Sequence, residues 1–146
     1  MSNKHGWNTW ENYLRVHESV LRKYQANFIS PAPKYSVIKF TEYYYQLTLK
    51  NLELKTRKGT VVCINIEKDV EVRPGGTKQV ARTEGYSYQA WLKGGRNLVR
   101  YDSPHVNHNK FHHKHDYLYL PKDVLPVKND EWPHVSEFFD EIINNF

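Results

Sequence analysis

Residues 86–101 read Tyr-Ser-Tyr-Gln-Ala-Trp-Leu-Lys-Gly-Gly-Arg-Asn-Leu-Val-Arg-Tyr, and this stretch decides the fold. Its two halves are rich in aromatic and branched residues, which favour strands, and they flank the turn segment Lys93-Gly94-Gly95-Arg96. A glycine pair between two such segments is typical of a β-hairpin, because glycine adopts the positive φ that tight turns need. We therefore expect two antiparallel strands here and an antiparallel sheet around them.

More strands are expected upstream, where residues 35–72 are dominated by β-formers and by leucines separated by polar residues. Strand-forming residues cluster at 37–40 and 43–45, and leucines nearly alternate with polar residues over 47–54. A turn is expected at Arg57-Lys58-Gly59, a return strand at 61–66, a turn at Pro74-Gly75-Gly76 and a further strand at 78–82. Downstream, residues 117–120 alternate as an edge strand does, and Pro121 and Pro126 bracket an expected linker. The sheet would then have about five or six strands.

Helices are expected at both ends of the chain. Apolar residues recur at helical spacing over 7–24, and His17 is expected on the surface of this helix. A second apolar face runs over 132–143 and begins beside acidic residues, where the helix dipole favours negative charge. Helix, antiparallel sheet and helix make an α+β fold, and residues 1–146 are expected to form one domain.

Composition narrows the class of protein. The chain has 146 residues, 39% of them hydrophobic and 14% aromatic, which supports a packed core and argues against disorder. Its net charge of +5 suits a polyanionic partner such as nucleic acid. The one cysteine, Cys63, excludes a disulfide framework and is expected to be a buried hydrophobe. With no apolar run near ~18 residues and no signal-peptide pattern, we expect a soluble, cytoplasmic protein that does not enter a membrane.

A histidine-rich run follows directly after the hairpin. Five of the chain's eight histidines fall between residues 105 and 115, namely His105, His108, His112, His113 and His115. Histidine exchanges protons near neutral pH and is the commonest metal ligand, whereas so dense a cluster adds little to a core. Because the run has no apolar periodicity, we expect a loop at the end of a strand, and within it a working site.

Three interpretations of this run are open. The first is metal binding, with His108, His112 and His115 as ligands, although none of the common zinc signatures is present. The second is metal-free acid–base catalysis on the phosphodiester of RNA, in which one histidine acts as the base and another as the acid. The third is a polar loop whose histidines only hydrogen-bond the edges of the sheet.

The metal-free mechanism predicts roles for residues around the run. Asp102 would hold one histidine in a single tautomer, and Arg100 would stabilise the phosphate. These two residues lie two positions apart, so both point to one face of the sheet if the strand continues that far. The expected substrate-binding residues are further cations and exposed tyrosines on which bases stack, namely Arg82, Lys114, Tyr86, Tyr88 and Tyr101.

Three segments follow one another around the glycine turn: Tyr86-Ser87-Tyr88, Arg100-Tyr101-Asp102-Ser103-Pro104-His105 and Phe111-His112-His113-Lys114-His115. This series resembles the TumE-type family, the toxin components of prokaryotic toxin–antitoxin modules, and the resemblance covers about residues 60–116. It implies a growth-inhibiting toxin that a small antitoxin neutralises. Carried over by position, it implies a site made of Glu67, Tyr86, Tyr88, Arg100, Asp102, His105, His112, His113 and His115.

We therefore expect a toxin of a type II module that cleaves RNA without a metal or another cofactor. The predicted catalytic residues are Glu67, Arg100, Asp102, His105, His112, His113 and His115. The expected partners are a cognate antitoxin and RNA, and a homodimer is allowed. Two alternatives stay open: a metal-dependent nuclease or other hydrolase that uses the same loop, and a non-catalytic nucleic-acid-binding protein.

Overall fold

The structure, a computed structural model, describes residues 5–104, 111–128 and 131–146. Its elements are, in chain order, β1 (Asn8–Thr9), α1 (Trp10–Lys23), the short 3-10 helix η1 (Gln25–Asn27), β2 (Ser36–Lys39), β3 (Tyr44–Lys55), β4 (Val61–Gly75), β5 (Lys78–Leu92), β6 (Asn97–Asp102), β7 (His112–Asp116), β8 (Leu120–Val127) and α2 (Val135–Asn145). Strands β2 to β8 form a sheet in which each strand lies antiparallel beside the next one in the sequence, and β1 pairs with β5. The α+β order is as expected, but the described residues form eight strands rather than five or six.

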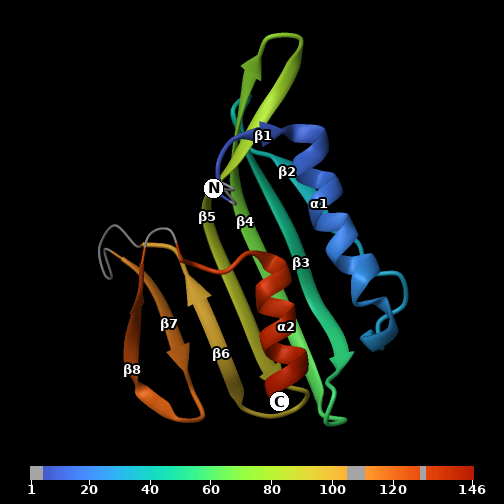
Figure 1. The fold of residues 1–146 in the computed structure, drawn as a ribbon, viewed down its shortest axis with the longest axis vertical. Coiled ribbons are helices and arrows are strands. Elements are labelled where there is room, and N and C mark those ends of the chain that lie inside the picture. The colour runs from blue at the N-terminus through green and yellow to red at the C-terminus, as the bar shows by residue number, and fades with distance from the viewer. Residues whose placement is uncertain (1–4, 105–110, 129–130) are drawn as a thin grey trace.

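Helices α1 and α2 lie on the same side of the sheet (Figure 1). Ile66, Tyr88 and Tyr101 are paired neighbours on β4, β5 and β6, and all three belong to the core beneath the helices. Because successive side chains of a strand alternate between faces, the adjacent row points the other way. That row consists of Glu67, Ser87 and Asp102. We call this second side, which neither described helix covers, the open face.

Helix α1 is held by a cap and by one apolar face. Thr9 is the N-cap residue, and its Oγ1 accepts a hydrogen bond from the backbone N–H of Asn12 at 3.1 Å. The buried face of the helix includes Tyr13 and Val20. His17 lies four residues after Tyr13, on the same face, and is 2% exposed. The expectation that His17 is a surface residue is therefore wrong.

Helix α2 begins later than the apolar pattern suggested. Trp132 and Pro133 precede it, and His134 is its N-cap residue, with an extended backbone. The Nδ1 atom of His134 accepts the backbone N–H of Ser136 at 3.3 Å, so the first helical residue is Val135. The buried face consists of Val135, Phe138, Phe139, Ile142 and Ile143. Neither described helix is long and apolar enough to span a membrane.

The predicted turns are confirmed, and the strands between them are longer than expected. Strands β4 and β5 each run for 15 residues, with a bulge in their pairing between Asp69 and Val70. Gly76 turns the chain between them with a φ of +76°, and Gly94 turns it between β5 and β6 with a φ of +65°. Cys63 is buried on β4, as expected.

Two expectations about residues 112–127 are wrong. The second half of the histidine-rich run is not a loop, because residues 112–116 form β7 against β6. Residues 117–119 form a turn rather than an edge strand, and the expected linker after them is β8. The prolines Pro121 and Pro126 are tolerated there because β8 is the last strand of the sheet and donates no hydrogen bonds outward.

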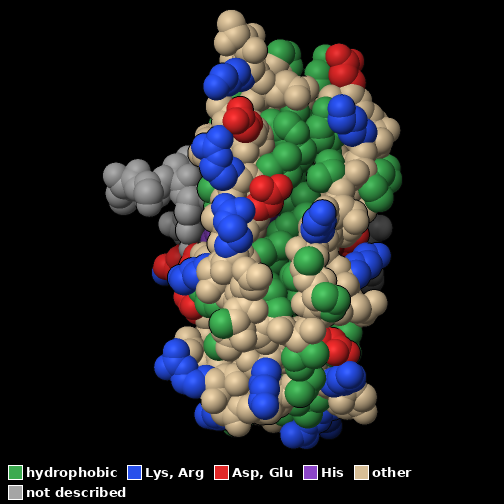
Figure 2. Space-filling view, turned by 90° about the vertical axis from the view of Figure 1, so that its right-hand side faces the viewer, with side chains coloured by type: hydrophobic (Ala, Val, Ile, Leu, Met, Phe, Trp, Pro, Cys, Tyr) green, Lys and Arg blue, Asp and Glu red, His purple; other side chains and the backbone are tan. Residues whose placement is uncertain are grey.

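The other edge of the sheet is β2, and all four of its residues are exposed. Figure 2 looks at this side and shows hydrophobic side chains gathered along its middle, with lysine and arginine side chains around them. A groove between α1 and the segment before β2 is lined by Leu14, Leu21, Tyr35 and Val37 among others. This side is remote from the histidine-bearing strand, which lies toward the opposite edge of the sheet.

Candidate active site on the open face

The pairing of β6 with β7 gathers four of the predicted catalytic residues. Arg100 is the direct partner of His115, and Asp102 is the direct partner of His113. These positions differ by two along each strand, so all four side chains point to the same face. That face is the open face, because Asp102 belongs to the row opposite the core.

Asp102 is the centre of this group. Its carboxylate receives the Nε–H of Arg100 at 3.1 Å and 2.9 Å from its two oxygens, and the Nε2 atom of His113 lies 3.5 Å from Oδ2. The side chains of Asp102 and His113 are 4% and 2% exposed, whereas that of Arg100 is 38% exposed. A buried carboxylate is therefore held between an imidazole below the surface and a guanidinium that reaches solvent.

The two histidines of the group differ in accessibility. The rings of His113 and His115 meet edge to face with centroids 5.3 Å apart, and His115 also stacks on Tyr117 at 5.6 Å. His113 has the carbonyl oxygen of Phe111 at 3.1 Å from Nδ1. His115 is only half-buried. Of the two imidazoles, His115 is thus the one that a large substrate reaches first.

The same residues offer donors for a metal ion. One ligand atom from each of Asp102, His113 and His115 lies within 4.8 Å of the others. Nitrogen and carboxylate oxygen are ligands that zinc and other transition metals accept. However, Arg100 already contacts both oxygens of Asp102, and a guanidinium at that place opposes a second cation by charge repulsion.

Glu67 shares the open face but does not touch this group. It pairs across β5 through Ser87 with Asp102, so two strand spacings, or about 10 Å, separate them. Its Oε1 atom accepts a hydrogen bond from Gln46 at 2.7 Å. Ser87 and Gln89 also lie in these rows, beside Asp102 and Arg100. Neither Ser87 nor Gln89 was predicted to be a site residue, although their alternation with the tyrosines of β5 places them together on one face.

His112 lies on the opposite side of the sheet from His113 and His115. Its Nδ1 atom is 2.8 Å from the hydroxyl of Tyr86, and its ring stacks with those of Tyr86 and Trp132. Burial, and after it the charge of His113, lowers the pKa of His112 and so favours the neutral ring. The expected metal set of His108, His112 and His115 is therefore wrong, because one ion cannot be reached from both faces. His105 and His108 lie outside the described residues.

The tyrosines expected to stack on bases are not exposed. Tyr86, Tyr88 and Tyr101 are 5%, 0% and 9% exposed, because they face the core beneath α2. Tyr88 packs on Phe138, and the hydroxyl of Tyr101 donates to Glu141 at 2.6 Å. The prediction of an aromatic surface at these positions is wrong.

The two predicted substrate-binding cations also lie away from the group. Lys114 is on the helix side of β7, where its Nζ donates to Glu141 at 2.8 Å. Arg82 pairs with Glu71 at 2.9 Å, near the far end of β5. Of the predicted cations, only Arg100 stands beside the histidines.

These observations describe a small sheet protein with a buried core on one face and a histidine–aspartate–arginine group on the other. Residues 36–145 match the model of the family described as Toxin TumE. The chain therefore belongs to the TumE toxin family. The match runs from the first residue of β2 to the last residue of α2 and includes the whole group around Asp102. No curated protein and no solved structure matches the chain. Membership in a toxin family implies an antitoxin partner.

Proposed function

We propose that the protein is the toxin of a type II module and that it cleaves RNA in the cytoplasm without a metal ion. The observation that carries this proposal is the convergence of Arg100, Asp102, His113 and His115 on the open face of the sheet. Metal-free cleavage of RNA requires a base for the 2′-hydroxyl, an acid for the leaving oxygen and a cation for the charge on phosphorus. This group contains each of the three.

We propose roles for the four side chains from their accessibility. His115, the more exposed imidazole, takes the proton of the 2′-hydroxyl as the 2′-oxygen bonds to phosphorus. The bond from phosphorus to the 5′-oxygen breaks, and His113 gives that oxygen a proton. The products are a 2′,3′-cyclic phosphate and a free 5′-hydroxyl. Arg100 binds the phosphate oxygens, and Asp102 positions both Arg100 and His113.

His113 has to be uncovered for this reaction, because its side chain is 2% exposed. Phe111 lies edge to face against it, with ring centroids 6.2 Å apart, and is itself exposed. We infer that Phe111 moves aside when RNA binds. A base of the RNA would then take the place of the phenyl ring, since single-stranded RNA presents stacking faces.

A second candidate, favoured by the 4.8 Å grouping of donor atoms, is a metal-dependent nuclease with Asp102, His113 and His115 as ligands. It requires Arg100 to release Asp102, so that the carboxylate is free to bind the ion. The metal would activate water or polarise the phosphate. The two candidates use the same side chains and differ in their response to chelation.

The experiment is incubation of the purified protein with total RNA, with and without EDTA, followed by analysis of the new ends. The matched variants are His115→Ala and His112→Phe, which change histidines of the same strand on opposite faces. EDTA-resistant cleavage with 2′,3′-cyclic ends, lost in His115→Ala and kept in His112→Phe, is the expected result. Cleavage abolished by EDTA would favour the metal candidate. If no new RNA ends form either with or without EDTA, the ribonuclease proposal is wrong, and the protein is a non-catalytic binding protein or a toxin with another target.

A further inference from the structure

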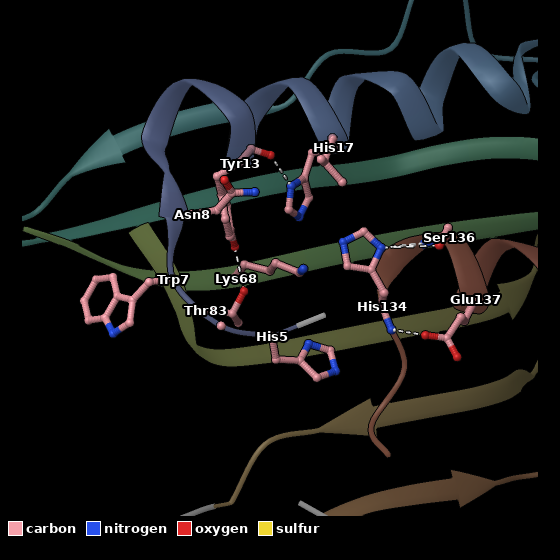
Figure 3. Close-up of a pocket in the computed structure, with 12 residues that line it drawn as sticks. His5, Trp7, Asn8, Tyr13, His17, Lys68, Thr83, His134, Ser136 and Glu137 are labelled. Carbon is pink, nitrogen blue, oxygen red and sulfur yellow. Dashed lines mark hydrogen bonds between the residues drawn. The ribbon is translucent and has the colours of Figure 1, made fainter. Parts of the chain in front are cut away.

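A cavity of about 410 Å³ lies on the helix side of the sheet, at the start of both helices. Figure 3 shows Tyr13 and His17 of α1 on one wall and His134, at the start of α2, on another. Lys68 of β4 and Thr83 of β5 line it from the sheet. Since Lys68 points to the core side of β4, this cavity is separated by the sheet from the group around Asp102.

Lys68 brings a buried ammonium group to this cavity. Its side chain is 1% exposed, and its Nζ lies 5.8 Å from the ring centroids of Tyr13 and of Tyr88. None of the ion pairs between described residues includes Lys68. Burial lowers the pKa of this lysine to about 7. Burying the charged form of a side chain is unfavourable unless an opposite charge lies beside it, so a bound anion would stabilise the ammonium of Lys68.

His17 contributes a buried polar atom that has no hydrogen-bond partner. Its Nδ1 atom donates to the carbonyl oxygen of Tyr13 at 2.8 Å, and its Nε2 atom is buried without a hydrogen-bond partner. Burial, and after it the positive charge of Lys68, holds the pKa of His17 well below its usual range. In Figure 3 the His17 ring and the end of the Lys68 side chain point toward one another. A negatively charged group between them would pair with Lys68, and it would favour protonation of His17, whose Nε2 atom then becomes a donor.

The start of α2 adds a third favourable feature for an anion. The Nδ1 atom of His134 accepts the backbone N–H of Ser136 and so caps the helix. The rings of His17 and His134 are 5.5 Å apart. The N-terminus of a helix carries partial positive charge. The acidic residue at the cavity, Glu137, is directed to the cap, where it accepts the backbone N–H of His134.

We propose that this cavity binds a phosphate monoester, with Lys68 as its charged donor and His17 as a second donor once the Nε2 atom of that ring takes up a proton. A phosphate group has several acceptor oxygens and therefore can receive a hydrogen bond from each of these side chains at once. The volume suits a small ligand, since binding pockets begin at roughly 300 Å³. One wall comes from α1, which precedes the matched region at 36–145, so membership in the family does not by itself imply this site.

The test is titration calorimetry of the whole chain with inorganic phosphate and, separately, with AMP at pH 7. Lys68→Met removes the charge and keeps the length of the side chain, and Lys50→Met, an exposed lysine of β3, is the matched control. We expect saturable binding that Lys68→Met weakens by at least about tenfold, the effect of losing one charged donor. Tighter binding of AMP would identify a nucleotide as the ligand, and equal binding would limit recognition to the phosphate.

The assignment has an independent readout in proton uptake. Because the amine of Lys68 is partly neutral at pH 7, an anion that restores its charge takes up a proton, which calorimetry in two buffers of different ionisation enthalpy measures. The titratable groups around Lys68 are Tyr13 and His17 of α1, Tyr88 of β5, His5 before β1, His134 at the cap of α2, and Glu137 of α2. His17→Gln should also weaken binding, and it guards against a folding effect of the lysine variant. No saturable binding of either ligand, or binding and uptake unchanged in Lys68→Met, would overturn the proposal.

Discussion

Replacing Lys68 with methionine should stabilise the protein, by an amount that depends on pH. A lysine pKa lowered from 10.5 to about 7 means that the folded state disfavours the ammonium. At ~1.36 kcal/mol for each pKa unit, the cost is about 4 kcal/mol at pH 7, where the folded amine is half neutral. At pH 9 the folded amine is neutral and the unfolded one is still mostly protonated, which leaves about 2 kcal/mol.

The sign follows from proton binding. Between pH 7 and pH 10.5 the unfolded chain binds more protons at this lysine than the folded chain does, so the stability of the wild type rises with pH across this window. Below pH 7 the full cost is present, and above pH 10.5 it is gone. Methionine has no charge to bury. Its advantage over lysine should therefore shrink by roughly 2 kcal/mol between pH 7 and pH 9.

The assay is urea unfolding of both proteins at pH 7 and pH 9, in phosphate-free buffer so that no anion occupies the cavity. Packing differences between the two side chains do not depend on pH and cancel in the comparison. Lys50→Met reports the pH dependence of an exposed lysine. An advantage of Lys68→Met that is the same at both pH values would refute the reasoning, because it would mean that Lys68 is charged in the folded state throughout.

Three further changes test other parts of the structure. Asp102→Asn removes the charge that holds Arg100 and His113. We expect this variant to lose its toxicity in a growth assay and to be less stable by about 1–3 kcal/mol. A variant as toxic as the wild type at equal abundance would contradict the proposed site. The Glu67→Gln variant should remain toxic, since Glu67 does not contact the group around Asp102. A non-toxic variant at normal abundance would indicate that Glu67 takes part in the reaction. Thr9→Ala should lower the urea midpoint by the equivalent of about 1 kcal/mol with an unchanged m-value, and an unaltered midpoint would mean that the cap does not stabilise α1.

Much of the fold could be predicted because local rules and tertiary structure agree there. The glycine turns, the two terminal helices and the strands between them all follow from residue patterns a few positions long. The shared face of Arg100 and Asp102 follows in the same way, since a strand needs only to continue by two residues. In these segments, contacts with distant parts of the chain do not change the local structure that the sequence favours.

The features that could not be predicted depend on contacts between residues far apart in the sequence. Strand β7 is polar on both faces, so it has no alternation to detect, and its pairing with β6 decides which histidines join Asp102. The tyrosines of β5 are buried because α2, about 50 residues later, packs over them. His17 sits beneath the surface because its helix lies over Lys68 and beside His134. The face of the sheet on which a side chain lies, and the residues that it contacts, are set by tertiary packing. Residue type alone does not predict them.

The neighbour-by-neighbour order of the sheet has a consequence for how the chain folds. Strands β2 to β8 each pair with the strand made just before them, so most of the sheet forms by closing short turns. Such local closure predicts fast folding for a protein this rich in strands. Helix α2 is different, because it packs on strands that lie far before it in the sequence. We expect its docking to be the late step, which completes the core after the strands carrying Asp102 and His113 have already paired.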